Sequence, residues 1–215
     1  MKVTKQMNKH HEKLLKWIEI VSAVLISLAT ITSAWCVYQS SRWAGEERSS
    51  SNRATAARTE SVRFSNQALQ LKTIDVAMFT EFAAAYSNED EFLYDFLMER
   101  FRPEMKVAVD AWIETQPLIN HDAPTSPFEM AEYKSEAQEE SDRFLEEVEA
   151  HLDEARLDNE RGDNYTLLTV IFASVLFFGG INSKFTSIKI RLGLVIIASL
   201  IIFITVFWAL TFPIL

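Results

Sequence analysis

The stretch DNERGDNYTLLTVIFASVLFFGGINSKF, residues 158–185, passes from dense charge to pure hydrocarbon within a few positions. No proline interrupts it, so one helix can run through both parts. The apolar part, residues 165–182, is close to the shortest length with which a helix crosses a bilayer. The stretch therefore predicts a long helix that is solvated at its beginning and embedded in a membrane at its end.

Two further apolar blocks accompany this stretch. Residues 17–38, WIEIVSAVLISLATITSAWCVY, would extend over about 33 Å at about 1.5 Å per residue, which matches the hydrocarbon core of a bilayer. Residues 192–212, LGLVIIASLIIFITVFWALTF, form the third block. As core helices of a soluble protein, the three blocks would have no polar face to present to water. We therefore predict three transmembrane helices.

The first block is expected to remain in the mature protein as an anchor. Its apolar run is longer than that of a signal peptide, and Trp35 rather than a small residue precedes Cys36. Aromatic residues mark the ends of the blocks, as expected at a membrane interface; they are Trp17, Trp35, Tyr38, Trp43, Tyr165 and Trp208.

Charge predicts the orientation of the chain. Residues 1–16 hold five lysines, and the short segment 183–191 adds Lys184, Lys189 and Arg191. Residues 40–164 contain 13 basic and 28 acidic residues, a net charge of −15. Basic segments stay on the cytoplasmic side, so the acidic middle region is expected outside. The predicted segments are a cytoplasmic tail (1–16), span one (17–38), an extramembrane domain (39–164), span two (165–182), a cytoplasmic loop (183–191) and span three (192–212).

The extramembrane domain is predicted to be helical almost throughout, because residues 40–164 contain only two glycines. Pro103 is expected to open a short helix that Pro117 ends, and residues 120–128, with two prolines, form the clearest loop. An apolar stripe at helical spacing precedes them at Leu71, Ile74, Met78, Phe82 and Ala85.

A second long helix is expected over residues 128–163, running into span two. A narrow apolar seam with coiled-coil spacing follows it, at Tyr133, Ala137, Phe144, Val148, Leu152 and Ala155. This segment has a net charge of −10, whereas residues 40–72 have a net charge of +3. Both segments are expected to lead to the same face of the membrane, so they would run antiparallel. Their opposite charges favour pairing. The predicted fold is all-α: three transmembrane helices with an extramembrane antiparallel hairpin or bundle continuous with spans one and two.

Small and hydroxylated residues within the spans are candidates for helix packing or for lining a pore. They are Ser22, Ala23, Ser27, Thr30, Ser33, Gly179 and Gly180. Glu19 is the only ionisable residue inside a span, and it lies near the cytoplasmic edge. The absence of charge near the midplane disfavours a proton relay or an ion-coupled transporter.

The sequence has no phosphate-binding loop, dinucleotide fingerprint or HExxH motif, and we predict no catalytic residue, cofactor or metal site. His151 has ligand-like spacing to Glu147 and Glu154, but a metal would need two more ligands.

Arginines recur every five residues from Arg48 to Arg63 and thus spiral around a helix. Together with the acidic total, this predicts no nucleic-acid binding.

Four stretches together resemble a family of bacterial integral membrane proteins that have a helical insert between the first two spans. They are SAWCVYQSSRWAGEE (33–47), FRPEMKVAVDAW (101–112), APTSPFEMAEY (123–133) and LTVIFASVLFFGGI (168–181). The resemblance implies a bacterial inner-membrane location and the three-span architecture. It implies no catalytic or binding residues, because the family has no assigned activity.

Three functions are compatible with these features. The leading one is a non-enzymatic, membrane-anchored interaction or scaffold subunit that self-associates or binds another envelope protein. The second is a homo-oligomeric channel whose pore is lined by serine and threonine of span one. The third is a membrane-bound enzyme acting near His121 and Asp122 in the proline-containing loop.

Overall fold

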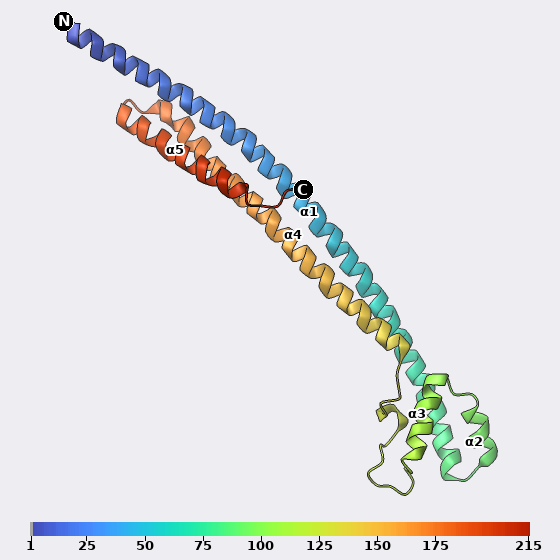
Figure 1. The fold of residues 1–215 in the computed structure, drawn as a ribbon. Coiled ribbons are helices and arrows are strands. Elements are labelled where there is room, and N and C mark those ends of the chain that lie inside the picture. The colour runs from blue at the N-terminus through green and yellow to red at the C-terminus, as the bar shows by residue number, and fades with distance from the viewer. Residues whose placement is uncertain (1) are drawn as a thin grey trace. The chain divides into compact units, whose positions relative to one another are not determined.

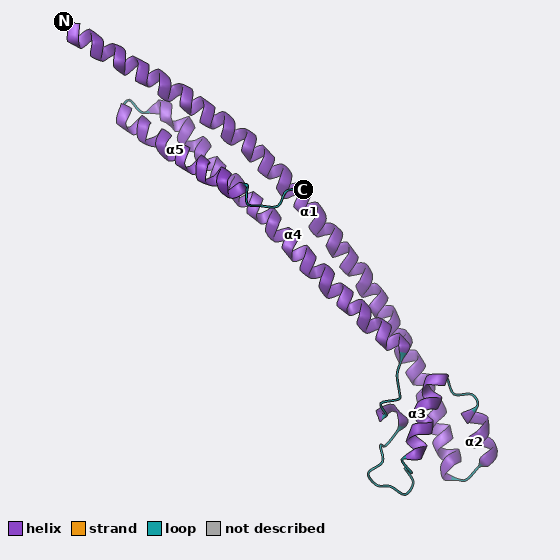
Figure 2. Ribbon diagram, viewed as in Figure 1, coloured by secondary structure: helices purple, strands orange, loops and turns teal. Residues whose placement is uncertain are grey.

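The structure is a computed structural model that describes the backbone of residues 2–215 and the side chains from residue 12 onward. The lysines predicted to hold the N-terminal tail in the cytoplasm at positions 2, 5 and 9 lie outside the described side chains. All regular structure in the described part of the chain is helical, and loops connect the helices (Figure 2). The predicted all-α class is confirmed.

The first helix, α1 (Lys2–Ser87), has 86 residues and runs from the N-terminal segment through span one into the middle region (Figure 1). It contains Gly45 as its only glycine and no proline, so nothing in its sequence breaks the hydrogen-bond ladder. It ends where the polar turn of residues 88–90 begins, and Glu89 adopts a left-handed conformation there with φ of 56°.

The second long helix, α4 (Glu136–Ile181), has 46 residues and passes through Gly162 without interruption. It contains the stretch that passes from charge to hydrocarbon. A single 3₁₀ turn, η2 (Asn182–Lys184), follows it and leads into α5 (Ile188–Ala209). Helices α1, α4 and α5 each contain a segment long and apolar enough to cross a membrane.

Three short elements connect α1 to α4 along the chain. Helix α2 (Glu91–Met98) begins with a side-chain cap, because Asp90 accepts a hydrogen bond from the backbone N–H of Leu93 at 3.1 Å. Helix α3 (Pro103–Glu114) has the predicted proline at its first position. A 3₁₀ turn, η1 (Pro127–Glu129), follows the proline-containing loop.

The start of α4 differs from the sequence-based expectation. The predicted helix over 128–163 begins only at Glu136, and residues 130–135 form turns and extended backbone. Pro124 and Pro127 lie in the loop and the 3₁₀ turn before this segment, and residues 128–135 contain no proline. Tyr133 therefore does not belong to the α4 seam, which is a correction to the prediction.

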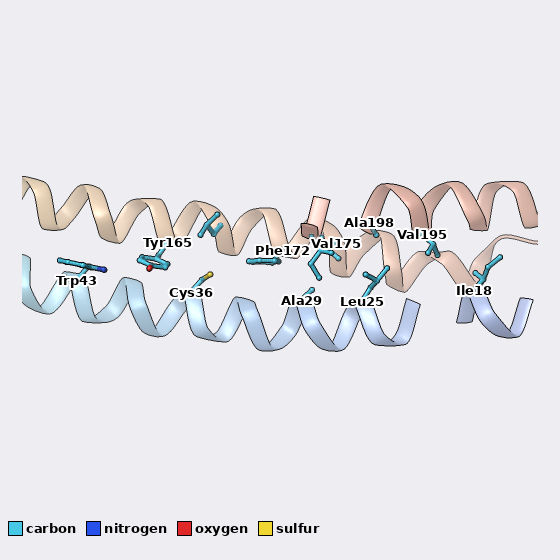
Figure 3. Close-up of a cluster of buried hydrophobic side chains, with 12 residues drawn as sticks. Ile18, Leu25, Ala29, Cys36, Trp43, Tyr165, Phe172, Val175, Val195 and Ala198 are labelled. Carbon is cyan, nitrogen blue, oxygen red and sulfur yellow. The ribbon is translucent and has the colours of Figure 1, made fainter. Parts of the chain in front are cut away.

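The chain divides into two compact units. The three-helix unit comprises the chain up to Asn52 together with His151–Leu215, and the head unit comprises Arg53–Ala150. In the three-helix unit, apolar side chains of α1, α4 and α5 fill the space between the helices (Figure 3). The residues of this core are Ile18, Leu25, Ala29, Cys36, Trp43, Tyr165, Leu168, Phe172, Val175, Val195, Ala198 and Ile202.

The core of the head unit is aromatic. Phe82 of α1 is fully buried, and its ring lies 5.4 Å from that of Phe101 and 5.1 Å from that of Tyr94. Helix α3 adds Met105, Val109 and Trp112 to the same cluster. Aromatic pairs in these offset and edge-to-face arrangements stabilise a core by about 0.5–1.5 kcal/mol each beyond the area that they bury.

Candidate interaction surfaces

Buried positions along α1 are separated by three, four or seven residues within each unit. In the three-helix unit the buried positions include Ile18, Ser22, Leu25, Ala29, Cys36, Gln39 and Trp43. In the head unit they include Ala54, Ala57, Ser61, Ala68, Asp75, Phe82 and Ala85. This spacing of about 3.5 residues keeps one narrow face of a helix against a neighbouring helix.

Two of the predicted span residues join α1 to the end of α4. Asn182 donates a hydrogen bond of 2.7 Å from its side-chain nitrogen to the hydroxyl of Ser22, and both residues are buried. Gly179 lies directly against Ile26, where an added Cβ would stand 2.7 Å from Cγ1 of the isoleucine. A larger residue at this position would force the Ile26 side chain to shift, so the glycine allows α4 and α1 to pack closely here.

The other span candidates are placed differently. Ala23, Ser27 and Thr30 are exposed on α1, whereas Ser33 is half-buried. The hydroxyls of Ser27 and Thr30 donate to backbone oxygens one turn earlier in their own helix. Gly180 has open space where a Cβ would be. Sequence reasoning placed these small residues in one group, and the structure divides them between two faces.

A polar contact that sequence reasoning missed holds the end of the described chain to α1. The fully buried side-chain amide of Gln39 donates to the backbone oxygen of Leu215 and accepts from its N–H, both at 3.1 Å. In the same terminal segment, the carbonyl of Pro213 accepts from the hydroxyl of Tyr165 in α4 at 3.1 Å. The residues after α5 are thus hydrogen-bonded to both long helices.

The opposite end of α5 is tied to α1 by an ion pair. Arg191 is buried and donates to the carboxylate of Glu19 at 3.1 Å. The sequence identified each residue separately, Glu19 as the ionisable residue in span one and Arg191 as part of the basic loop. The structure brings them together between helices.

In the head unit, α1 and α4 approach closely through small residues. The hydroxyl of Ser141 donates to the backbone oxygen of Ser61 at 3.0 Å, so a side chain of one helix reaches the backbone of the other. The rings of Phe64 and Phe144 stack 5.7 Å apart. Of the predicted seam, Ala137, Val148 and Ala155 are buried on α4 and Phe144 and Leu152 are half-buried.

The most deeply buried charge of the head unit is Asp75 on α1. Both of its carboxylate oxygens accept from Arg102, at 3.1 Å from Nε and 2.6 Å from Nη2. Tyr133 donates its hydroxyl to the same carboxylate at 3.1 Å. Three segments that are far apart in the sequence therefore meet at one fully buried group.

This contact perturbs the ionisation of its partners. Burial and the neighbouring Asp75 carboxylate raise the pKa of Tyr133 to about 12. The hydrogen bonds to Asp75 also raise the pKa of the Arg102 guanidinium. Both shifts favour the protonated forms of Arg102 and Tyr133, which donate hydrogen bonds to the carboxylate. The cluster therefore holds the segments that contain Arg102 and Tyr133 against α1.

The predicted apolar stripe contained Ile74, but the structure exposes Ile74 and buries Asp75 instead. An acidic residue next to a run of apolar ones is ordinarily solvated, which is why the sequence pattern favoured its neighbour. The spacing from Ala68 through Asp75 to Phe82, in two steps of seven, is the signal that could have located it.

Helix α1 of the head unit also has an outer stripe, eight successive positions at steps of four and three on its exposed face; Leu69 of this stripe also lines a hollow with Gln138 and Glu139 of α4. All eight side chains are exposed and none is charged. The hydroxyls of Thr59, Thr73 and Thr80 donate to backbone oxygens of their own helix. The outer stripe consists of Thr55, Thr59, Val62, Asn66, Leu69, Thr73, Val76 and Thr80.

The corresponding face of α4 is strongly acidic. Glu139, Asp142, Glu146 and Glu149 follow the same steps and are all exposed, and we name these four residues the acidic stripe. Leu145 lies beside them and is 48% exposed. The two arms of the head unit thus present opposite kinds of surface on their outer faces.

Among the described residues, no group of three or more potential ligands is arranged to hold a metal ion. His151 lies 3.6 Å from a carboxylate oxygen of Glu154, one turn further along α4. His121 and Asp122 are exposed in the loop, where the backbone N–H of Asp122 donates to the side chain of Asn120.

Comparison of the chain with protein families, with curated proteins and with solved structures gave no match. The fold itself defines the class: a helical protein with three helices able to span a membrane and a separate helical head unit.

Proposed function

We propose that the protein is a non-enzymatic, membrane-anchored interaction subunit whose head unit binds another polypeptide, either a second copy or another envelope protein. In this proposal the three apolar segments cross a bacterial inner membrane. The N-terminus and the basic loop after α4 lie in the cytoplasm, and the head unit lies outside. The positive-inside distribution of lysine and arginine supports this orientation.

The proposal treats the α1 and α4 arms as an antiparallel coiled-coil hairpin. Contacts between the two helices support this geometry within the three-helix unit, where Ser22 bonds to Asn182 and Ser40 bonds to Thr166. Residue numbers therefore rise along one helix as they fall along the other. The burial spacing of about 3.5 residues is the period of a left-handed coiled coil.

The observation that carries the proposed role is the outer stripe of α1. A helix surrounded by water normally presents charged residues on its outer face, and the outer stripe presents none over eight positions. Its larger apolar side chains are well exposed, with Val62 at 54% and Leu69 at 64%. Because three of the threonine hydroxyls bond within the helix, their methyl groups are left to face a partner.

A photo-crosslinking amino acid at position 69, introduced in cells, tests this role. We expect position 69 to capture another polypeptide chain. Position 67 is the matched control, because Gln67 is also exposed but lies about 160° around α1, two residues away at about 100° each. Equal, background-level capture at both positions would contradict the proposed function.

A homo-oligomeric channel is the second candidate. The exposed positions of Ser27 and Thr30 on α1 favour it, because both would be available to line a pore between copies. The channel proposal predicts conductance when the purified protein is added to planar bilayers. Silence across several lipid compositions and voltages would argue strongly against it.

A further inference from the structure

We infer that the partner of the outer stripe is a second copy of this chain, which docks the acidic stripe of its α4 against α1. The inference rests on the proposed interaction role and names the partner. It predicts rows or rings of head units in which α1 of one copy alternates with α4 of the next. Such a contact is heterologous, since two different surfaces meet.

Charge complementarity selects α4 rather than α1 of the second copy. The outer stripe is flanked by Arg58 and Lys72, and both side chains are exposed. Within the described part of the chain neither of these two residues forms an ion pair. Pairing two α1 helices through this stripe would bring the same basic residues together.

The acidic stripe supplies the missing partners. Glu139, Glu146 and Glu149 are exposed, and among the described side chains none of the three has a basic partner. The arginine nearby, Arg143, is already occupied, since it pairs with Glu140 at 2.6 Å and with Glu147 at 2.7 Å. Unpaired acids on one helix thus correspond to unpaired bases on the other. Leu145 provides an apolar contact for Val62.

The register of this contact follows from the head unit itself when two copies stand side by side in the same orientation. Within one head unit, Ser61 lies beside Ser141 and the ring of Phe64 stacks on that of Phe144, so Val62 and Leu145 are at similar levels along the two helices. A second head unit at the same height presents its α4 at that level and in the direction opposite to α1. Arg58 of one copy then lies level with Glu146 of the next, and Lys72 lies level with the beginning of α4.

Cysteine crosslinking between two differently tagged copies tests the contact. Both copies carry Cys36→Ala, which removes the only cysteine of the chain. One copy carries Val62→Cys and the other carries Leu145→Cys; both sites are exposed, so neither change disturbs the core. After oxidation in membranes, we expect a disulfide-linked species with both tags, since bridging requires the two Cα atoms to approach within about 7 Å.

The matched control replaces Leu145→Cys with Ala150→Cys. Ala150 is exposed on the same helix, but five steps of about 100° place it about 140° around α4 from Leu145. We expect the control pair to give only background crosslinking. A mixed species no more abundant than this background would overturn the inference, as would efficient linkage of Val62→Cys to itself in two copies.

Charge exchange provides a second readout that does not depend on disulfide geometry. Arg58→Glu with Lys72→Glu in the Val62→Cys copy should lower the yield of the doubly tagged, disulfide-linked species about tenfold, which corresponds to about 1.4 kcal/mol. Glu139→Lys with Glu146→Lys in the Leu145→Cys copy should restore it. No loss, or loss without restoration, would contradict the charge pairing.

The two proposals fail in different ways. If position 69 captures a different polypeptide and the tagged copies never crosslink, the inference of self-docking is wrong while the interaction role stands. If position 69 captures nothing above its control and the copies do not crosslink, both are wrong.

Discussion

Arg102 donates hydrogen bonds to both carboxylate oxygens of Asp75, a fully buried residue of the long helix α1. Arg102 immediately precedes α3 and also contacts Glu104 at 3.3 Å. The pair therefore fixes where α3 packs along α1. Tyr133, which precedes α4, bonds to the same carboxylate and adds a third segment to the junction.

Removing the arginine should destabilise the head unit strongly. Arg102→Met leaves the buried Asp75 carboxylate without its charge partner, and such a loss costs about 3 kcal/mol or more. Thermal unfolding of the full chain in detergent, followed by tryptophan fluorescence, measures the effect. Arg100→Met, at an exposed arginine two positions earlier, is the control. Equal stability of the two variants would show that the Asp75–Arg102 pair does not stabilise the head unit.

The double variant Asp75→Leu with Arg102→Met should recover most of the lost stability. Replacing a buried ion pair by apolar residues of similar volume is often neutral, because the desolvation cost of both charges disappears. A double variant that is less stable than Arg102→Met alone would mean that Asp75 has a role other than pairing with the arginine.

Stability of the head unit should fall at high pH through Tyr133. The pKa of Tyr133 is raised from about 10 in the unfolded chain to about 12 in the fold. Because the fold favours the protonated hydroxyl of Tyr133, this group contributes its full stabilisation below pH 10. The stabilisation is lost as the pH rises through 12. Unfolding midpoints of the wild type and Tyr133→Phe, measured from about pH 8 to pH 12, should converge as the pH rises. A constant difference would contradict the shift.

Adjacent glycines in α4 should respond differently to the same change. Gly179→Leu forces Ile26 and α1 to move, at a cost of about 1–3 kcal/mol for overpacking. Gly180→Leu meets open space and should be tolerated. Thermal stability of both variants in detergent compares them directly. Equal losses would mean that α1 does not pack on Gly179 in the folded protein.

The orientation of the chain can be tested with an impermeant thiol reagent in intact cells. In the Cys36→Ala background, Asp122→Cys in the head-unit loop should be labelled, because the proposal places this loop outside. Ser183→Cys in the basic turn after α4 is also exposed but should be labelled only after the cells are opened. The reverse pattern would invert the proposed topology.

Much of the fold could be predicted from the sequence, because its strongest signals are local. The apolar blocks and the lack of proline predict the long helices, and Pro103 correctly marks the start of α3. The predicted start of α4 is too early, because Tyr133, four positions before Ala137, continues a helical spacing that the backbone does not follow. Tyr133 turns instead toward Asp75, a contact over 58 positions that no local pattern reveals.

The packing faces could be predicted only in part. Apolar positions such as Ala137 and Val148 were identified by their spacing, but the polar positions Ser61, Ser141 and Gln39 were not. Spacing shows which residues share a face only when they are chemically alike. A buried serine or glutamine is identified by its partner, and the partner becomes known only from the tertiary structure.

Native mass spectrometry of the protein, released gently from its own membrane, tests the central claim that it is an interaction subunit. We predict a complex of two or more copies, or of this chain with a second polypeptide, that survives detergent removal in the gas phase. A fixed number of copies would support self-docking of the head units. A monomer of 24.6 kDa that carries only lipid or detergent would contradict the account.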